Sequence, residues 1–208
     1  MIEIIDCEQG SPEWFQARLG IPTASCFKDV LAQNVARTGP GLTRATYMRR
    51  LAGEIITGQP AETFKSSEME RGNDMETDAR NNYTFKLRAD PIRVGFVRNG
   101  NVGCSPDSFL GDDGILELKT QKAELLIATL DADRFPPEHI AQCQGALAVT
   151  GRKWVDLCVY WPGMPLFVKR AQRDEEYIRM LTTELDRFNG ELADMVARIR
   201  SYGQRKAA

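Results

Sequence analysis

The chain has 208 residues, of which 42% are hydrophobic and 27% are charged, as is ordinary for a globular protein with one sizeable core. No run approaches the roughly 20 apolar residues of a membrane span, and the acidic N-terminus lacks the basic start of a signal peptide. We therefore expect one cytoplasmic domain over residues 1–208. The formal net charge is −2, so any role in nucleic-acid binding must depend on where the basic groups lie.

Several common kinds of site are excluded by what the sequence lacks. Five cysteines are scattered along the chain without a CxxC pair, which argues against a zinc site, a disulfide framework or a four-cysteine iron–sulfur cluster. His139 is the one histidine and is interpreted as structural, because a histidine-based metal site or a catalytic triad needs further partners. No GxxxxGK[ST] motif occurs, so we expect no ATP-driven translocation by this chain.

The first half of the chain is predicted to be helical. Ser11 is a suitable N-cap and Pro12 a suitable first-turn residue for a short helix that ends before Gly20. A second helix is predicted to open at Thr23 and to run to about Gln33. A polar, glycine-containing loop over 34–43 and helices near 43–57 and 66–88 follow.

The middle of the chain changes to the periodicity of strands. The predicted strands, with turn residues between them, are 92–97, 102–104, 114–120, 154–160 and 166–170. Helices are predicted near 122–132 and 137–150, and apolar residues recur at helical spacing from Tyr177 to Ile199. The sum is an α/β (α+β) domain in which a central mixed sheet is flanked by helices.

A short segment near the middle carries most of the chemical information. Glu117 and Lys119 lie two residues apart in a predicted strand and so project to one side, while Leu118 points into the core. A glycine turn after a short apolar strand would fold Asp107, of a Pro-Asp pair, back beside Glu117. Two carboxylates that close repel each other unless a cation lies between them. Mg²⁺ or Mn²⁺ prefers such hard oxygen ligands, and the backbone carbonyl of Leu118 could supply another.

This set of groups suits hydrolysis of a phosphodiester bond. The metal would polarise the phosphate and activate a water. Lys119 would orient or deprotonate that water, or neutralise charge in the transition state. An acid-x-lysine pair is also common on the solvated edge of a sheet, so the pair taken alone does not decide the function.

Further motifs occur in order along most of the chain and resemble those of the phage lambda exonuclease (YqaJ-type viral recombinase) family. They are 8–14, 17–25, 71–72, 76–80, 104–107, 117–119, 141–144, 149–151 and Trp154. The resemblance implies a restriction-endonuclease-like PD-(D/E)xK fold and a Mg²⁺-dependent exonuclease that degrades one strand of linear double-stranded DNA from 5′ to 3′. It also implies phage-type homologous recombination, a ring-shaped homotrimer and a single-strand annealing protein as partner.

The resemblance assigns roles to individual residues near the metal. Asp107 and Glu117 match metal ligands, and Lys119 matches the catalytic lysine. Glu76 matches a further acid that acts near the metals, directly or through a water, and Gln142 matches an amide that lines the same site. Without their motifs, Glu76 would be interpreted as a solvated helix acid and Gln142 as a capping or core-edge amide.

A second set of residues matches positions that the family uses around the 5′-phosphate of DNA. These are Arg18, Thr23 and Ser25, with Ser105 nearby. Hydroxyls and free N–H groups at a helix N-terminus bind anions, and a guanidinium binds phosphate in two-pronged fashion. Plain helix capping is the alternative for Thr23 and Ser25. The sequence leaves two interpretations of Trp14, which are stacking near the DNA end and packing in the core.

Three alternatives stay open at this point. Arg37 and Arg44 flank the glycine-containing loop and would either track the DNA backbone or be solvated. The chain could be another PD-(D/E)xK nuclease, such as a restriction-type endonuclease or a RecB-like enzyme, which would be distinguished by cutting of circular DNA. It could also be a catalytically silent DNA-binding module, against which the intact Asp107, Glu117 and Lys119 argue.

Overall fold

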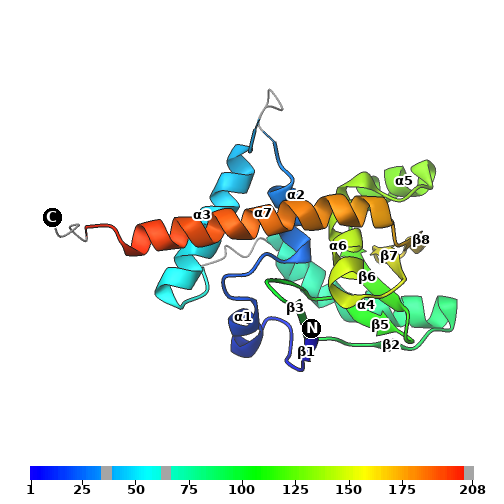
Figure 1. Ribbon diagram of the computed structural model, residues 1–208. Coiled ribbons are helices and arrows are strands. Elements are labelled where there is room, and N and C mark those ends of the chain that lie inside the picture. Colours follow the sequence, from blue (N-terminus) through cyan, green and yellow to red (C-terminus); the bar gives the residue numbers. More distant parts are fainter. Residues whose placement is uncertain (34–38, 62–66, 204–208) are drawn as a thin grey trace.

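The computed structural model describes residues 1–33, 39–61 and 67–203, and for residues 67–74 it describes the backbone alone (Figure 1). Its helices, including the 3-10 turns η1 and η2, are α1 (Pro12–Arg18), η1 (Ala24–Cys26), α2 (Phe27–Val30), α3 (Leu42–Thr57), α4 (Ser67–Leu87), α5 (Ala123–Ala132), η2 (Pro137–His139), α6 (Ile140–Thr150) and α7 (Glu175–Arg200). Its strands are β1 (Ile2–Ile5), β2 (Pro91–Ile92), β3 (Phe96–Asn99), β4 (Val102–Cys104), β5 (Ser108–Leu110), β6 (Gly114–Thr120), β7 (Trp154–Tyr160) and β8 (Phe167–Gln172).

The strands form two sheets rather than one. The larger sheet has the order β2-β5-β6-β7-β8 and is mixed, because β6 and β7 run parallel while its other neighbours run antiparallel. The smaller sheet is antiparallel and has the order β1-β3-β4. The expected mixed sheet with flanking helices is confirmed, and the small sheet is an addition that the sequence did not predict.

The single strand predicted over 92–97 is wrong. The structure divides it into β2, which joins the larger sheet, and β3, which joins the smaller one. Gly95 lies at the division, where a Cβ would approach the carbonyl oxygen of Cys7 to 2.4 Å and that of Ile5 to 2.6 Å. The chain changes sheets where its backbone passes directly against the segment after β1, a long-range approach that strand periodicity cannot indicate.

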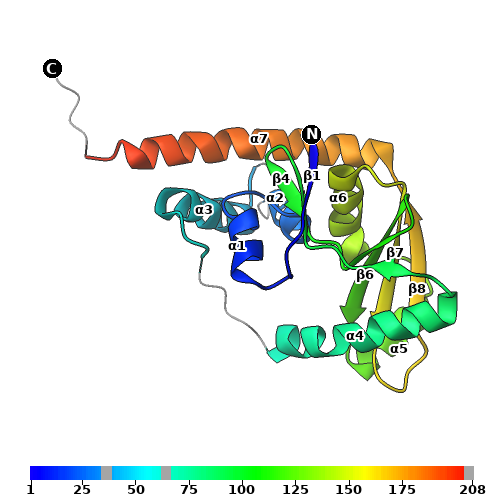
Figure 2. The same ribbon diagram turned by 90° about the horizontal axis from the view of Figure 1, so that it is seen from below.

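Helices cover both faces of the larger sheet (Figure 2). On one face α4 packs against β6 and β7, with Tyr83, Leu116 and Leu118 in its apolar cluster. On the other face α6 lies against β7, and the long helix α7 packs against α6. The core on this face includes Leu147 and Phe188. Leu118 is buried on the α4 face as predicted, so Glu117 and Lys119 project toward α6, because side chains alternate along a strand.

The first helices differ in part from the predictions. Ser11 caps α1 as expected, with its hydroxyl accepting from the backbone N–H of Trp14 at 3.2 Å. The helix predicted from Thr23 to Gln33 is wrong in its extent, because a 3-10 turn precedes an α-helix that ends at Val30. Thr23 makes no capping hydrogen bond, so its hydroxyl stays available to neighbouring side chains.

The two arginines that flank the loop have different outcomes. Arg37 lies outside the described residues. Arg44 is only 4% exposed and bonds the Glu191 carboxylate of α7 at 2.6 Å, so both readings of it, as a tracker of the DNA backbone and as a solvated residue, are wrong. It joins α3 to α7 across the core, where its guanidinium lies 5.0 Å from the Phe188 ring.

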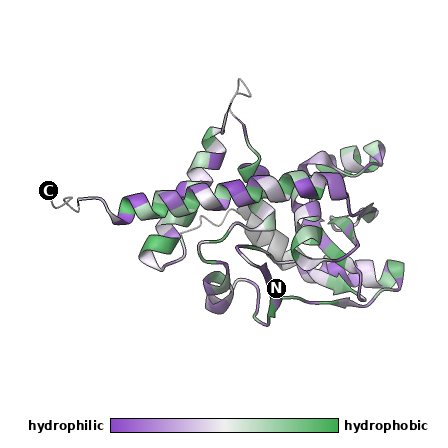
Figure 3. Cartoon of the chain, in the orientation of Figure 1, coloured by the Kyte–Doolittle hydropathy of each residue, from purple (hydrophilic) through white to green (hydrophobic). Residues whose placement is uncertain are grey.

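The colouring by hydropathy shows polar and apolar residues alternating around α7, which buries one side against the body of the molecule (Figure 3). None of the helices in the described part of the chain combines the length and hydrophobicity that a membrane span needs.

Candidate active site

The β5–β6 hairpin brings Asp107 beside Glu117. Ser108 pairs with Leu116 in the antiparallel ladder, so Asp107, which precedes β5, lies level with the residues just after Leu116. The Asp107 Oδ2 accepts a hydrogen bond from the backbone N–H of Leu118 at 2.5 Å. The turn expected from the glycine-containing sequence therefore places the first carboxylate against the strand that carries the second.

Glu117 is the most enclosed acid of this group, with 4% of the residue exposed. The Lys119 ammonium donates to its Oε1 at 2.7 Å, and the Gln142 amide from α6 donates to the same oxygen. Burial opposes the charge on Lys119, but the Glu117 and Asp107 carboxylates outweigh burial and raise the pKa of the lysine. Lys119 is therefore an ammonium at neutral pH.

The pKa of Asp107 is also raised, but for a carboxyl this shift disfavours the charged form. Burial raises its pKa well above the ordinary value, and the nearby Glu117 charge raises it further, while Lys119 and the Leu118 N–H oppose the shift. Burial and the neighbouring Glu117 thus disfavour the charged form of Asp107. A divalent cation between the two carboxylates would relieve their repulsion.

The backbone of β6 supplies a third oxygen donor at the same place. β5 pairs with β6 only as far as Leu116, so beyond that residue this edge of β6 is open. The N–H and C=O of one strand residue point to the same edge, and the Leu118 N–H points to Asp107. The Leu118 carbonyl therefore faces the same space as the Asp107 carboxylate.

These groups fit a hard divalent cation. Asp107, Glu117 and the Leu118 carbonyl offer oxygen atoms alone, which Mg²⁺ and Mn²⁺ prefer. Among residues 1–33, 39–61 and 67–203, no three histidine, cysteine, aspartate or glutamate side chains form a metal-binding group. The Leu118 carbonyl would add a third oxygen to the two carboxylates.

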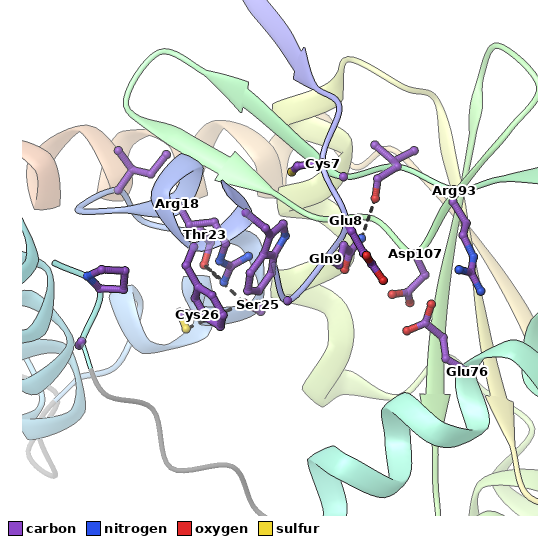
Figure 4. A pocket seen from close by; sticks show the side chains of 18 of the residues that line it. Cys7, Glu8, Gln9, Arg18, Thr23, Ser25, Cys26, Glu76, Arg93 and Asp107 are labelled. Carbon is purple, nitrogen blue, oxygen red and sulfur yellow. Dashed lines mark hydrogen bonds between the residues drawn. The ribbon is translucent and has the colours of Figure 1, made fainter. Parts of the chain in front are cut away.

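Glu76 approaches the same place from α4. Figure 4 shows its carboxylate next to that of Asp107 at one end of the cavity. The Arg80 Nη2 donates to the Glu76 Oε1 at 2.5 Å and to the Asp107 carbonyl at 3.1 Å, while its Nε donates to the Ser108 hydroxyl at 3.0 Å. Arg80 thus ties the helix acid to the hairpin. The sequence assigned this residue no role, although its spacing of four from Glu76 was a usable signal.

A small cavity of about 220 Å³ borders the other side of Lys119 and Gln142. Ser25, Lys28, Glu138 and His139 are among its lining residues. Burial, together with the charges of Lys119 and Lys28, lowers the pKa of His139 to about 4. The imidazole is therefore neutral at physiological pH.

The residues predicted around the 5′-phosphate form one hydrogen-bonded group. Arg18 donates to the Ser105 hydroxyl at 3.2 Å and to the Thr23 hydroxyl at 3.3 Å, and the Thr23 and Ser25 hydroxyls lie 3.4 Å apart. Burial lowers the pKa of Arg18. Trp14 belongs to the same group, because its indole N–H donates to Ser105 at 2.8 Å and its ring lies 4.0 Å from the Arg18 guanidinium.

Several residues of this group were missed from the sequence. The Tyr47 hydroxyl of α3 accepts from the Thr23 backbone N–H at 3.0 Å. Arg50, three residues later on the same helix face, stacks 4.8 Å from the Tyr47 ring and donates to the Cys26 thiol at 3.6 Å. Gln9, quoted only as part of a motif, bonds the Pro106 carbonyl beside Asp107 at 2.9 Å. No local pattern indicates that α3 and the N-terminal segment meet.

Residues of both groups border one cavity of about 680 Å³. Glu76 and Asp107 lie at one end, while Arg18, Thr23, Ser25 and Cys26 lie at the other (Figure 4). We refer to these as the acidic end and the basic end; Arg50 lines the same cavity and, by its contact with Cys26, belongs to the basic end. One cavity is thus bordered by two carboxylates at one end and by guanidinium and hydroxyl groups at the other.

Comparisons with known proteins agree with this geometry. The chain matches the family model of the YqaJ-like viral recombinase domain over residues 13–153. It is similar to an alkaline exonuclease, LHK-Exo, from Laribacter hongkongensis, with 31% identity, a TM-score of 0.81 and coverage of 91% of this chain and 96% of that chain. The structure of LHK-Exo in complex with dAMP matches at the same identity and coverage, with a TM-score of 0.82.

A phage-related exonuclease from Haemophilus somnus 129PT is 12% identical, with a TM-score of 0.64 and coverage of 86% of this chain and 96% of that chain, a likeness of fold alone. No curated protein matches the chain. The restriction-endonuclease-like PD-(D/E)xK fold expected from the sequence is confirmed.

Proposed function

The chain belongs to the YqaJ-like viral recombinase domain family, and from this premise we propose that it is a metal-dependent exonuclease. It hydrolyses phosphodiester bonds in one strand of linear double-stranded DNA, from the 5′ end. One observation carries the proposal: Asp107, beside Glu117 and Lys119, borders the same cavity as the Arg18 group. Groups suited to cleavage therefore lie within reach of groups suited to holding a DNA end.

The proposed cofactor is Mg²⁺, for which Mn²⁺ would substitute. Asp107, Glu117 and the Leu118 carbonyl would hold it, with Glu76 acting directly or through a water. When bound, the cation supplies Lewis-acid polarisation of the scissile phosphate. Gln142 fixes the orientation of Glu117, because its amide donates to that carboxylate.

Lys119 has a role that follows from its charge. Since its pKa is raised, the ammonium form is present at neutral pH, and it would orient the attacking water and neutralise charge that develops on the phosphate. Action as a general base would require a cation to cancel the two carboxylate charges that raise the pKa.

The basic end gives the proposed enzyme its dependence on ends. Arg18 and the hydroxyls of Thr23, Ser25 and Ser105 would bind the terminal 5′-phosphate, because a guanidinium with neighbouring hydroxyls offers several donors to phosphate oxygens. Arg18 contacts no carboxylate in the described structure, so an anion would complete its bonding.

The remaining proposals rest on family membership. We propose a role in phage-type homologous recombination in the bacterial cytoplasm, a homotrimeric ring around the DNA, and a single-strand annealing protein as partner. A ring would supply processivity by enclosing the substrate.

Incubation with linear and closed circular duplex DNA, each with Mg²⁺ or with EDTA, tests the proposed function. We expect linear DNA to be degraded only with Mg²⁺, circular DNA to survive, and a 5′-phosphorylated end to be degraded faster than a 5′-hydroxyl end. Cutting of circular DNA would favour an endonuclease. Binding without any cleavage would favour a catalytically silent module.

A further inference from the structure

Two guanidinium groups share the basic end of the cavity without a carboxylate contact. Arg18 ends α1 and Arg50 lies on α3, and both line the cavity. Within the part of the chain that the structure describes, the Arg18 nitrogens bond the hydroxyls of Ser105 and Thr23, and the Arg50 side chain bonds the Cys26 thiol. None of these acceptors is a carboxylate, so neither guanidinium forms a salt bridge with a residue that the structure describes.

Glu54, which also lines the cavity, accepts hydrogen bonds from backbone N–H groups. It accepts from the Gly20 backbone N–H at 2.9 Å through Oε2 and from the Ala61 backbone N–H at 3.4 Å through Oε1. Burial lowers the pKa of Arg18, whereas the pKa of Arg50 is raised despite its burial, chiefly by Cys26 and less by Tyr47 and Glu54. The remaining acids that line the cavity are Asp6, Glu8, Glu76 and Asp107. Of these, Glu8, Glu76 and Asp107 lie away from Arg18 and Cys26 (Figure 4).

Two like charges that converge on an open cavity are stabilised by an anion that contacts both. Arg50 can turn toward one, because the residue is exposed, its 3.6 Å contact with the Cys26 thiol is weak, and its other contact is stacking on the Tyr47 ring. No salt bridge within the described residues would have to break. A bound anion would therefore bring Arg50 closer to Arg18 at little cost.

We propose that Arg50 is a second phosphate-binding residue, which together with Arg18 selects the dianionic terminal phosphomonoester of a DNA strand over a singly charged phosphate. This inference rests on the proposed function and refines it. A terminal phosphate carries about −1.5 to −2 charges at neutral pH and three acceptor oxygens. Two guanidinium forks match that charge, whereas a singly charged phosphate leaves one fork without a partner. The pair thus identifies a strand end by its charge.

The test uses a DNA hairpin with one open end that bears a 5′-phosphate, a 5′-methyl phosphate or a 5′-hydroxyl. The methyl ester keeps the phosphate shape and removes one charge. Binding is measured by fluorescence anisotropy in EDTA, so that no hydrolysis occurs. Arg50→Gln is compared with Arg49→Gln, which removes the same charge from the adjacent, exposed position on α3 that does not line the cavity.

We expect Arg50→Gln to weaken binding of the 5′-phosphate hairpin about tenfold, the effect of losing one charge-assisted hydrogen bond. The loss should be smaller for the methyl phosphate and absent for the hydroxyl end. Arg49→Gln should change all three alike, and Arg50→Lys, which keeps the charge without the fork, should restore part of the selectivity.

Equal weakening for all three ends, or no weakening at all, would overturn the inference. An unchanged unfolding midpoint shows that the variant is folded. A wild-type protein that binds ends selectively but never digests linear DNA with Mg²⁺ would refute the proposed function instead. A digesting enzyme whose end selectivity is unaffected by Arg50→Gln would refute this inference alone.

Discussion

The acidic and basic ends of the cavity are built on different principles. At the acidic end Asp107 lies beside Glu117 and Lys119 of the same hairpin, and the β5–β6 ladder fixes the positions of these three residues. Asp107 accepts from the Leu118 N–H and Glu117 from Lys119, while Glu76 reaches the acidic end from α4. The backbone of the hairpin therefore brings most of these groups together.

The basic end is assembled from side chains on separate elements. Arg18 is the last residue of α1 and Arg50 comes from α3, and the side chains that bond them are hydroxyls and a thiol. This end keeps unneutralised charge for a ligand. We therefore expect residues of the acidic end to govern the rate of the chemical step and residues of the basic end to govern the affinity for one kind of DNA end.

The largest effect is expected for a substitution of Lys119, beside the acidic end. Lys119→Ala should lower kcat on linear DNA by about 1,000-fold, because it removes the ammonium that opposes charge in the transition state. Binding of DNA ends should change little. Lys153→Ala is the matched control, since this lysine is 68% exposed and bonds Asp113 away from the cavity. Steady-state digestion measures both variants, and equal rates for Lys119→Ala and wild type would remove the mechanism.

The next largest effect is expected for a substitution of Arg18 at the basic end. Arg18→Ala should raise KM for 5′-phosphorylated duplex by roughly 100-fold, because a half-buried guanidinium and its phosphate contacts are lost. The kcat for 5′-hydroxyl duplex should stay within a factor of a few. A fall in kcat alone, with KM unchanged for both ends, would break the comparison between the two ends.

A third prediction concerns the cavity beside Lys119. The pKa of His139 is about 4 in the folded protein and about 6.5 when unfolded. Above pH 6.5 the histidine costs no stability, and as the pH falls from 6.5 toward 4 the unfolded chain binds a proton that the folded protein does not. Between pH 7.5 and 4.5 the wild type should therefore lose roughly 2 kcal/mol more unfolding free energy than His139→Gln. Denaturant titrations at both pH values measure this, and parallel losses would contradict it.

The smallest effect is expected for a substitution of Arg80, which bonds Glu76 at the acidic end. Arg80 joins Glu76 to the Asp107 carbonyl, so Arg80→Gln should lower kcat by about tenfold, the usual size for residues that orient metal ligands. Because the two side chains act as a unit, Glu76→Gln combined with Arg80→Gln should cost little more than the larger single change. Additive losses would show that Arg80 does not act through Glu76. Calorimetry with Mn²⁺ separates lost metal affinity from lost rate.

The periodic elements and the hairpin that carries Asp107 and Glu117 could be predicted from local sequence. Helices α3 and α4 and strands β6 and β7 follow from local periodicity, and their bounds agree with the predictions to within two residues. Asp107 and Glu117 are ten residues apart with a glycine turn between them, so a two-strand pairing was enough to predict that they meet. Local pattern and short loop closure carry this information, because both depend on neighbours in the chain.

Tertiary structure alone decided the features that depend on distant segments. The division of 92–97 at Gly95, the burial of Arg44 against Glu191 and the approach of Arg50 to Cys26 join residues that periodicity treats as independent. Whether a charged side chain on a helix is solvated, paired or aimed into a cavity depends on which surface packs against that helix. That choice is made by the shape of the whole core, for which no short stretch of sequence contains the partner.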